Sequence, residues 1–189
     1  MLQFVQILYW LALSTWFGGV LFVAVAAPII FRVIREANPI LPHVLRTNLE
    51  GQHGTLLAGS IVGEILQTLT RVGLACAAGL LLALVLQVAL LDLSNRSNLV
   101  FLILRGAFFI GAVVFTVYDW RVVWPRTIKH RQEYIDHADE PDVANPAREQ
   151  FDRYHRESVT LLSIRLFLLL GMILFGGTFS STQTVSFGE

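Results

Sequence analysis

Two arginines of this sequence lie well inside long apolar stretches, away from their ends, where an ionised side chain is costly and usually serves a purpose. The first is Arg105, which lies between Leu104 and Gly106. Side chains expected at a similar depth could form, with Arg105, a polar outer pocket that binds an anion or a lipid headgroup; they are Gln87, Gln3, Gln6 and Tyr9. The alternative is an Arg105 whose stem lies in the apolar region while its guanidinium reaches outward to water.

Arg165 is the second such residue, and it is expected to pair with a carboxylate. Asp119, at the end of the preceding apolar stretch, is the best-placed partner, and Glu64 is a weaker one. A pair at this depth would hold helices together, because removing either partner leaves a costly unpaired charge. The same pair could instead gate a path or bind a substrate.

A dense mixture of aromatic and polar residues follows the third apolar stretch and precedes the fourth. Tryptophan and tyrosine favour a membrane–water boundary, because the ring is apolar and one edge is polar. The two segments therefore predict an aromatic belt at one membrane face. Their main residues are Trp124, Pro125 and Arg126 in the first, and Arg153, Tyr154, His155 and Ser158 in the second.

Three histidines, His43, His53 and His155, are expected on one side of the membrane and are the candidates for a metal or haem site. Histidine is a common metal ligand through its neutral ring. Their spacings match no His-x-x-x-His pair, and the single cysteine, Cys76, offers no thiolate cluster. No hydrolase, phosphate-binding or dinucleotide-binding motif occurs in a suitable context either. The sequence therefore predicts no cofactor and no catalytic residue, with haem or metal binding kept as an alternative.

The elements that must position these side chains are four apolar stretches, at residues 4–34, 72–91, 99–118 and 159–179. Each is long enough to cross a bilayer, which takes about 20 apolar residues in a helix. Charged residues make up 15% of the chain, below the roughly 25% of a soluble domain. We therefore expect an all-α integral membrane four-helix bundle that forms a single domain over residues 1–189.

Helical patterns continue beyond the membrane on the side of the longer connections. Asn38-Pro39 and Asn145-Pro146 both resemble an N-cap followed by a proline in the first helical turn. They predict a short surface helix at 39–48 and a helix that continues into the fourth span. Residues 55–71 should join the second span, whereas the acidic segment 133–142 is expected to be a solvated cytoplasmic loop.

Basic residues predict the orientation, because lysine and arginine concentrate in cytoplasmic loops. Seven of them lie between the third and fourth spans, whereas the turn between the second and third spans contains only Arg96. Both termini are therefore expected outside, and the longer loops in the cytoplasm. The formal net charge is zero, so nothing suggests a nucleic acid as partner.

Several motifs resemble those of transmembrane protein 205-like proteins, over about residues 5–180. They are Trp16-Phe17-Gly18-Gly19, Gly59-Ser60-Ile61-Val62-Gly63, Trp124-Pro125-Arg126-Thr127 and the segment 151–158. The resemblance implies a four-span membrane fold in a family without an established activity, one eukaryotic member of which is associated with drug resistance and export. It also implies that the seven aromatic and polar residues named above, from Trp124 to Ser158, form a shared site.

Three functions remain open from the sequence. The first is a non-enzymatic membrane protein that binds the lipid bilayer or a partner, for example as an accessory subunit of a larger complex. The second is a small-solute or drug transporter, which with four spans would act as a homo-oligomer. The third is a haem- or metal-linked redox protein. The Trp-x-Gly-Gly stretch of the first span also resembles membrane-bound protoporphyrinogen oxidases, but the histidine that those proteins carry there is absent.

Overall fold

The regular structure of this chain is helical throughout the residues that the computed structural model describes, which are 2–40, 51–90 and 96–176. No strand occurs in these ranges, so the predicted all-α fold is confirmed. The elements are α1 (Leu2–Ala37), α2 (His53–Leu90), α3 (Arg96–Tyr118), the π-helical turn η3 (Asp119–Val123), α4 (Trp124–Asp136) and α5 (Pro141–Gly176).

Within the described ranges, four helical rods are long and apolar enough to cross a membrane, namely Gln3–Ala37, His53–Ala89, Leu99–Asp136 and Pro141–Gly176. The third rod is α3, η3 and α4 in one continuous run. Each rod exceeds the roughly 20 residues that a bilayer requires, so the helices extend beyond the apolar layer. The chain therefore has the architecture of a multi-pass integral membrane protein.

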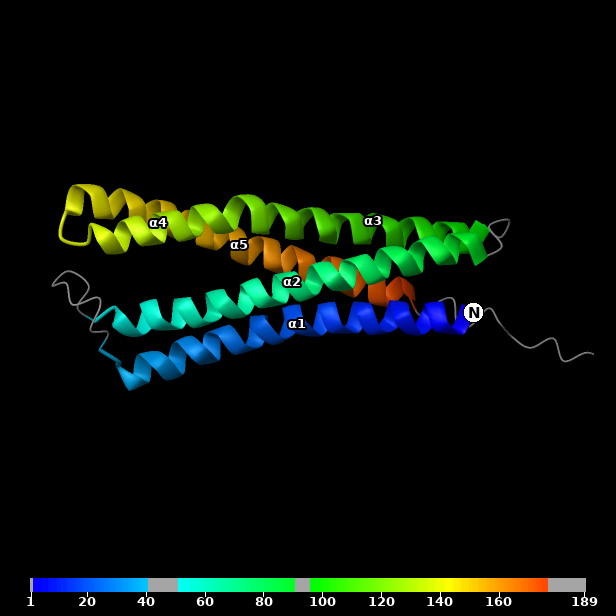
Figure 1. Ribbon diagram of the computed structural model, residues 1–189, viewed down its shortest axis with the longest axis horizontal. Helices are drawn as coiled ribbons and strands as arrows, with labels where there is room; N and C mark the ends of the chain where they lie inside the picture. The colour runs from blue at the N-terminus through cyan, green and yellow to red at the C-terminus, as the bar shows by residue number, and fades with distance from the viewer. Residues whose placement is uncertain (1, 41–50, 91–95, 177–189) are drawn as a thin grey trace, which may run out of the picture.

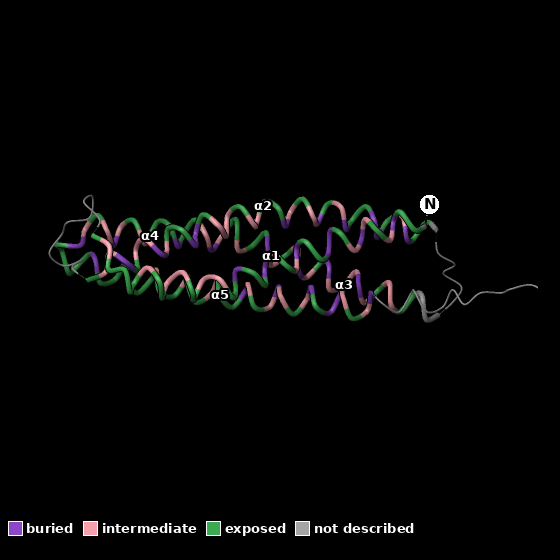
Figure 2. The backbone as a smooth tube through the Cα atoms, turned by 90° about the horizontal axis from the view of Figure 1, so that it is seen from below, coloured by how far each residue is buried: buried purple, intermediate pink, exposed green. Residues whose placement is uncertain are grey.

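The rods form two pairs that lie along each other (Figure 1). Helix α1 packs on α2, and the rod of α3, η3 and α4 packs on α5. Near the N-terminus, α1 also contacts α5, and the core there contains Tyr9, Leu13, Leu80, Leu169 and Met172, all fully buried. In Figure 2 buried positions recur along the inner side of the tubes, while much of the outer side is exposed.

The opposite end of the molecule, here called the α4 end, holds the end of α1, the start of α2, α4 and the start of α5 (Figure 1). The α1–α2 pair and the α4–α5 pair diverge toward this end. A small separate core of Tyr134, Ala138, Ala144 and Ala147 fastens α4 to α5. The two helices of each pair therefore stay packed, while the two pairs lie further apart at the α4 end than near the N-terminus.

The end of α1 differs from the predicted start of a new helix. Asn38 has a φ of +44°, and its N–H donates to the carbonyl of Arg35 at 3.2 Å. A left-handed asparagine in this place ends a helix at its C-terminus. Asn38 is therefore not an N-cap, and Pro39 and Ile40 are not helical. The rest of the predicted helix 39–48 lies outside the described residues.

The connection between α4 and α5 is much shorter than the predicted loop 133–142. Helix α4 continues through Asp136, and α5 already begins at Pro141. The carbonyl of Glu140 accepts the first backbone hydrogen bonds of α5, at 3.0 and 2.9 Å. A proline suits the first helical position because it needs no N–H donor there. The predicted helix start at Asn145 is therefore wrong by about one turn.

The close packing of α1 on α2 depends on Gly73. A Cβ atom added there would lie 2.6 Å from Nε1 of Trp16, which is buried. We expect Gly73→Val to lower the free energy of unfolding by about 1–3 kcal/mol, the usual cost of overpacking. Unfolding in detergent micelles, followed by tryptophan fluorescence, measures this change. Gly18→Val is the control, since nothing lies within 4 Å of a Cβ atom at Gly18. Equal stability of the two variants would contradict the packing.

Candidate functional site

A cavity of about 280 Å³ lies between the two helix pairs at the α4 end. Helices α2, α4 and α5 form most of its wall, and α1 contributes Phe31. The volume is close to the lower end of the range for small-molecule sites, about 300 Å³. The cavity is therefore large enough for one small or slender ligand.

The part of the cavity nearest the middle of the molecule is apolar. The indole of Trp124 lies against Gly63 of α2, where an added Cβ atom would be 3.0 Å from the ring. Val62 and Leu66, from the same stretch of α2, line this part as well. Glycine at position 63 thus lets the tryptophan ring lie close to the α2 backbone, and the surface beside it can bury an apolar group.

Polar side chains gather at the outer part of the cavity, which we call the polar mouth and define by Gln52, Tyr134 and Arg148. The hydroxyl of Tyr134 donates to Oε1 of Gln52 at 2.6 Å. The guanidinium of Arg148 lies 5.8 Å from the centre of the Tyr134 ring, a cation–π contact. Tyr134 follows Trp124 by ten residues of α4, so the mouth is about 15 Å from the apolar end.

Arg131 lies between these two parts and links α4 to α2. Its Nη2 donates to the carbonyl oxygen of Leu56 at 2.6 Å and to Oγ of Ser60 at 2.7 Å. An arginine keeps its positive charge even when it is partly buried. The wall of the cavity therefore contains a fixed cation held by two hydrogen bonds.

The π-helical turn η3 decides which side chains of α4 face the cavity. The N–H of Trp124 bonds to the carbonyl of Asp119, five residues back, instead of four residues back as in an α-helix. The extra residue rotates the rest of the rod by about 100°. Trp124, Thr127, Arg131 and Tyr134 then share the face that lines the cavity. Turns of this kind occur often at functional sites.

The structure does not bring together all seven residues of the predicted shared site. Trp124 and His155 line the cavity. Arg126 lies 5.6 Å from the ring centre of Tyr154, away from the lining residues. The remaining three are Pro125 and Arg153, which are exposed, and Ser158, which bonds to Asp119.

The histidines do not form a metal site in the described part of the chain. His155 stacks on Phe151, with 5.8 Å between ring centres. His53 is the first residue of α2, and His43 lies outside the described residues. Among the residues that the structure describes, no group of three or more histidine, cysteine, aspartate or glutamate side chains could hold a metal ion.

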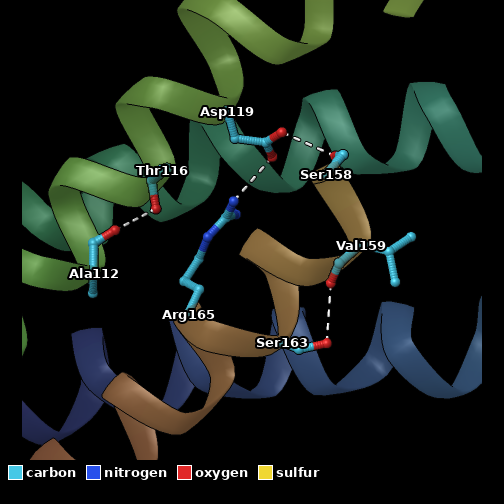
Figure 3. A network of polar contacts seen from close by, with 7 residues as sticks. All are labelled: Ala112, Thr116, Asp119, Ser158, Val159, Ser163 and Arg165. Atoms are coloured by element: carbon cyan, nitrogen blue, oxygen red, sulfur yellow. Dashed lines mark hydrogen bonds and ion pairs between the residues drawn. The ribbon is translucent and has the colours of Figure 1, made fainter. Parts of the chain in front are cut away.

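Arg165 and Asp119 form an ion pair deeper in the molecule (Figure 3). Nη2 of Arg165 lies 3.0 Å from Oδ2 of Asp119, and Ser158 donates to Oδ1 of Asp119 at 2.9 Å. The Arg165 side chain is 3% exposed and the Asp119 side chain 16% exposed, so a largely buried pair joins α5 to the first residue of η3. The expected partner is thus present, whereas the weaker candidate, Glu64, is exposed on α2.

Arg105 is fully buried and does not reach outward to water. Its Nε and Nη2 donate to the carbonyl of Phe175 at 3.0 and 2.9 Å, and Nη2 also donates to the carbonyl of Gly176 at 2.6 Å. These are the last residues of α5, whose terminal carbonyls have no partner within the helix. The guanidinium therefore caps α5, in the position that the negative end of a helix dipole favours.

The predicted polar pocket around Arg105 is only partly present. Nη1 of Arg105 donates to Oε1 of Gln87 at 3.3 Å, as expected for the two residues at one depth. Tyr9 adds a cation–π contact, with its ring centre 5.1 Å from the guanidinium carbon. Gln6, however, lines a shallow groove on the outer face of α1 with Trp10. The expectation that Gln6 joins this pocket stays a prediction, because Gln6 lies less than one helical turn from Tyr9 on α1.

Sequence reasoning missed most of the polar residues of the cavity, among them Arg131, Tyr134 and Arg148. Spacings of three and four residues from Trp124 to Tyr134 were a usable signal, since they place side chains on one helical face. The composition of residues 124–134 concealed this spacing, because charged residues on every face of a helix suggest a solvated surface.

Comparison with known proteins gives no relative from which a function could be transferred. No protein-family model, no curated protein and no solved structure matches this chain. The cavity and the charges around it are therefore the features of this chain that bear on its function.

Proposed function

We propose that this chain is a non-enzymatic integral membrane protein that binds a lipid-like amphiphile in the cavity at the α4 end. One observation carries the proposal: the cavity is apolar beside Trp124 and Gly63 and polar at the mouth around Arg148. A lipid-like molecule has the same division between an apolar chain and a polar head. Its chain would bury apolar surface at about 0.8 kcal/mol per CH₂ group.

The orientation of the protein is part of the same proposal. The α4 end would face the cytoplasm, because it carries Arg32, Arg35 and most of the other basic residues. The polar mouth would then lie at or beyond the level of the lipid headgroups, and the apolar end beside Trp124 would point into the bilayer. A lipid head and chain in the cavity would lie in the same sense as in the surrounding leaflet.

Binding is favoured over transport by what the two intramembrane arginines contact. A transport path would use Arg105 and Arg165, but each directs its guanidinium at oxygen atoms of the protein itself. Both contacts fasten helices to one another. Membership of the transmembrane protein 205-like family is part of this proposal and rests on the quoted motifs alone.

The proposal is tested by filling the cavity with Gly59→Leu. Gly59 lines the cavity, and a Cβ atom there would have only Nη2 of Arg131 within 4 Å, at 3.9 Å, so the new side chain has room to enter. We expect the unchanged protein, purified from its membrane in a mild detergent, to carry a stoichiometric lipid-like molecule. Gly59→Leu should carry far less of it, as measured by solvent extraction and mass spectrometry.

Gly18→Leu is the matched control, since it makes the same substitution on an exposed face of α1. It should retain the bound molecule in full. Circular dichroism and thermal unfolding check that both variants keep the native fold. Equal retention by Gly59→Leu and Gly18→Leu, with both variants folded, would contradict binding in the cavity.

A further inference from the structure

The side chains around the cavity carry more positive than negative charge. Arg131 and Arg148 both line it, and Asp152 is the single carboxylate among the described residues that do so. A surface with this imbalance attracts a ligand of negative charge.

Arg148 is held in a geometry that suits an oxyanion. Its guanidinium lies over the ring of Tyr134, and Tyr134 is itself fixed by the hydrogen bond to Gln52. The Arg148 side chain is exposed, so a ligand at the mouth can reach it. A guanidinium presents a rigid fork of N–H donors that matches the two oxygen atoms of a carboxylate or phosphate.

The size of the cavity selects the apolar part of the ligand. At about 280 Å³ it falls just below the range of ordinary small-molecule sites, and its lining residues on α4 run from Trp124 to Tyr134. This volume suits one acyl chain and is too small for the two chains of a phospholipid.

We infer that the ligand is a single-chain amphiphile with an oxyanion head, and that the head binds Arg148 beside Arg131 while the chain runs toward Trp124. This inference rests on the proposed function, because it names the ligand class of the same cavity. The inference differs from the proposed function in one respect: it requires a negatively charged head, whereas binding of an amphiphile in the cavity does not.

The test uses three probes that share one acyl chain: a fatty acid, a lysophosphatidic acid and an uncharged monoacylglycerol. Each is titrated into the delipidated full-length protein in detergent micelles, and the dissociation constant is measured by native mass spectrometry. We expect the better of the two anionic probes to bind at least about tenfold more tightly than the uncharged one, the effect of one charge-assisted hydrogen-bonding pair. Whichever anionic probe binds more tightly identifies a carboxylate or a phosphate as the source of the head.

Arg148→Gln should weaken the binding of the anionic probes about tenfold and that of the uncharged probe far less, so that most of the preference is lost. Arg156→Gln is the control, because Arg156 is exposed on the same helix and does not line the cavity. Equal affinities for charged and uncharged probes, or a preference that survives Arg148→Gln, would overturn the oxyanion head.

The same experiment separates failure of this inference from failure of the proposed function. An uncharged probe that binds the unchanged protein as tightly as the anionic ones, and is displaced by Gly59→Leu, would leave cavity binding intact and remove only the charged head. Failure of all three probes to bind the folded protein would contradict both proposals.

Discussion

Replacing Arg165 with methionine is expected to lower the free energy of unfolding by about 3–5 kcal/mol, the usual cost of removing one partner of a buried ion pair. The loss arises because Asp119 would stay in its shielded position with only Ser158 to stabilise its charge. Methionine is chosen because it keeps most of the side-chain volume. Unfolding in detergent micelles, followed by circular dichroism, measures the change.

A double-mutant cycle with Asp119→Leu separates the pair from other effects of the substitutions. The double variant should be more stable than the sum of the two single losses predicts, because no charge is left without a partner. Arg156→Met, on an exposed face of the same helix, should have no effect. Additive losses in the cycle would show that the 3.0 Å contact contributes nothing to stability.

Arg105→Met is expected to have the second large effect on stability. The substitution removes three hydrogen bonds from a charged donor to the carbonyls that end α5, and such bonds contribute about 1.5–3 kcal/mol each. Because the bonds share one side chain, we expect a total loss of about 3 kcal/mol or more. Carbonyls left without a donor are costly in an apolar surrounding, which adds to the loss.

Arg105→Lys distinguishes the cap from the charge alone. An ammonium keeps the positive charge but has no planar fork, so it should recover only part of the stability that Arg105→Met loses. Neither variant should lose the ligand of the cavity, since Arg105 lies at the other end of the bundle. The capping role would be contradicted if Arg105→Met had the same free energy of unfolding as the unchanged protein. It would also be contradicted if Arg105→Lys were as stable as the unchanged protein.

The helices could be predicted from sequence because apolar length and charge are strong signals in a membrane protein. Four long runs require helices, since a backbone in lipid must satisfy its own hydrogen bonds. The pairing of Arg165 with Asp119 followed from the same reasoning, because two charges buried at one depth need each other. These predictions depended on the composition of long segments, so an error of a few residues in where a helix begins or ends did not change them.

The cavity could not be predicted because it depends on which side chains of α4 face α2, and composition does not determine that rotation of the helix. The extra residue in η3 turns Arg131 and Tyr134 toward α2, and no sequence pattern signalled that turn. The acidic stretch that begins at Glu133 resembled a solvated loop, but Tyr134 and Ala138 on its buried side pack with Ala144 and Ala147 of α5. The role of Arg105 was hidden for a similar reason, since the end of α5 had to be placed in space before its carbonyls could be assigned a donor.

The most direct test of cavity binding is a crystal structure of the protein with a fatty acid that carries bromine at the end of its chain. Anomalous scattering locates bromine independently of the protein density. The account predicts a bromine peak in the apolar end of the cavity, beside Trp124, Gly63 and Leu66, in the unchanged protein and in Gly18→Leu but not in Gly59→Leu. Bromine found only on the outer faces of the helices, with the cavity free of it, would contradict the account.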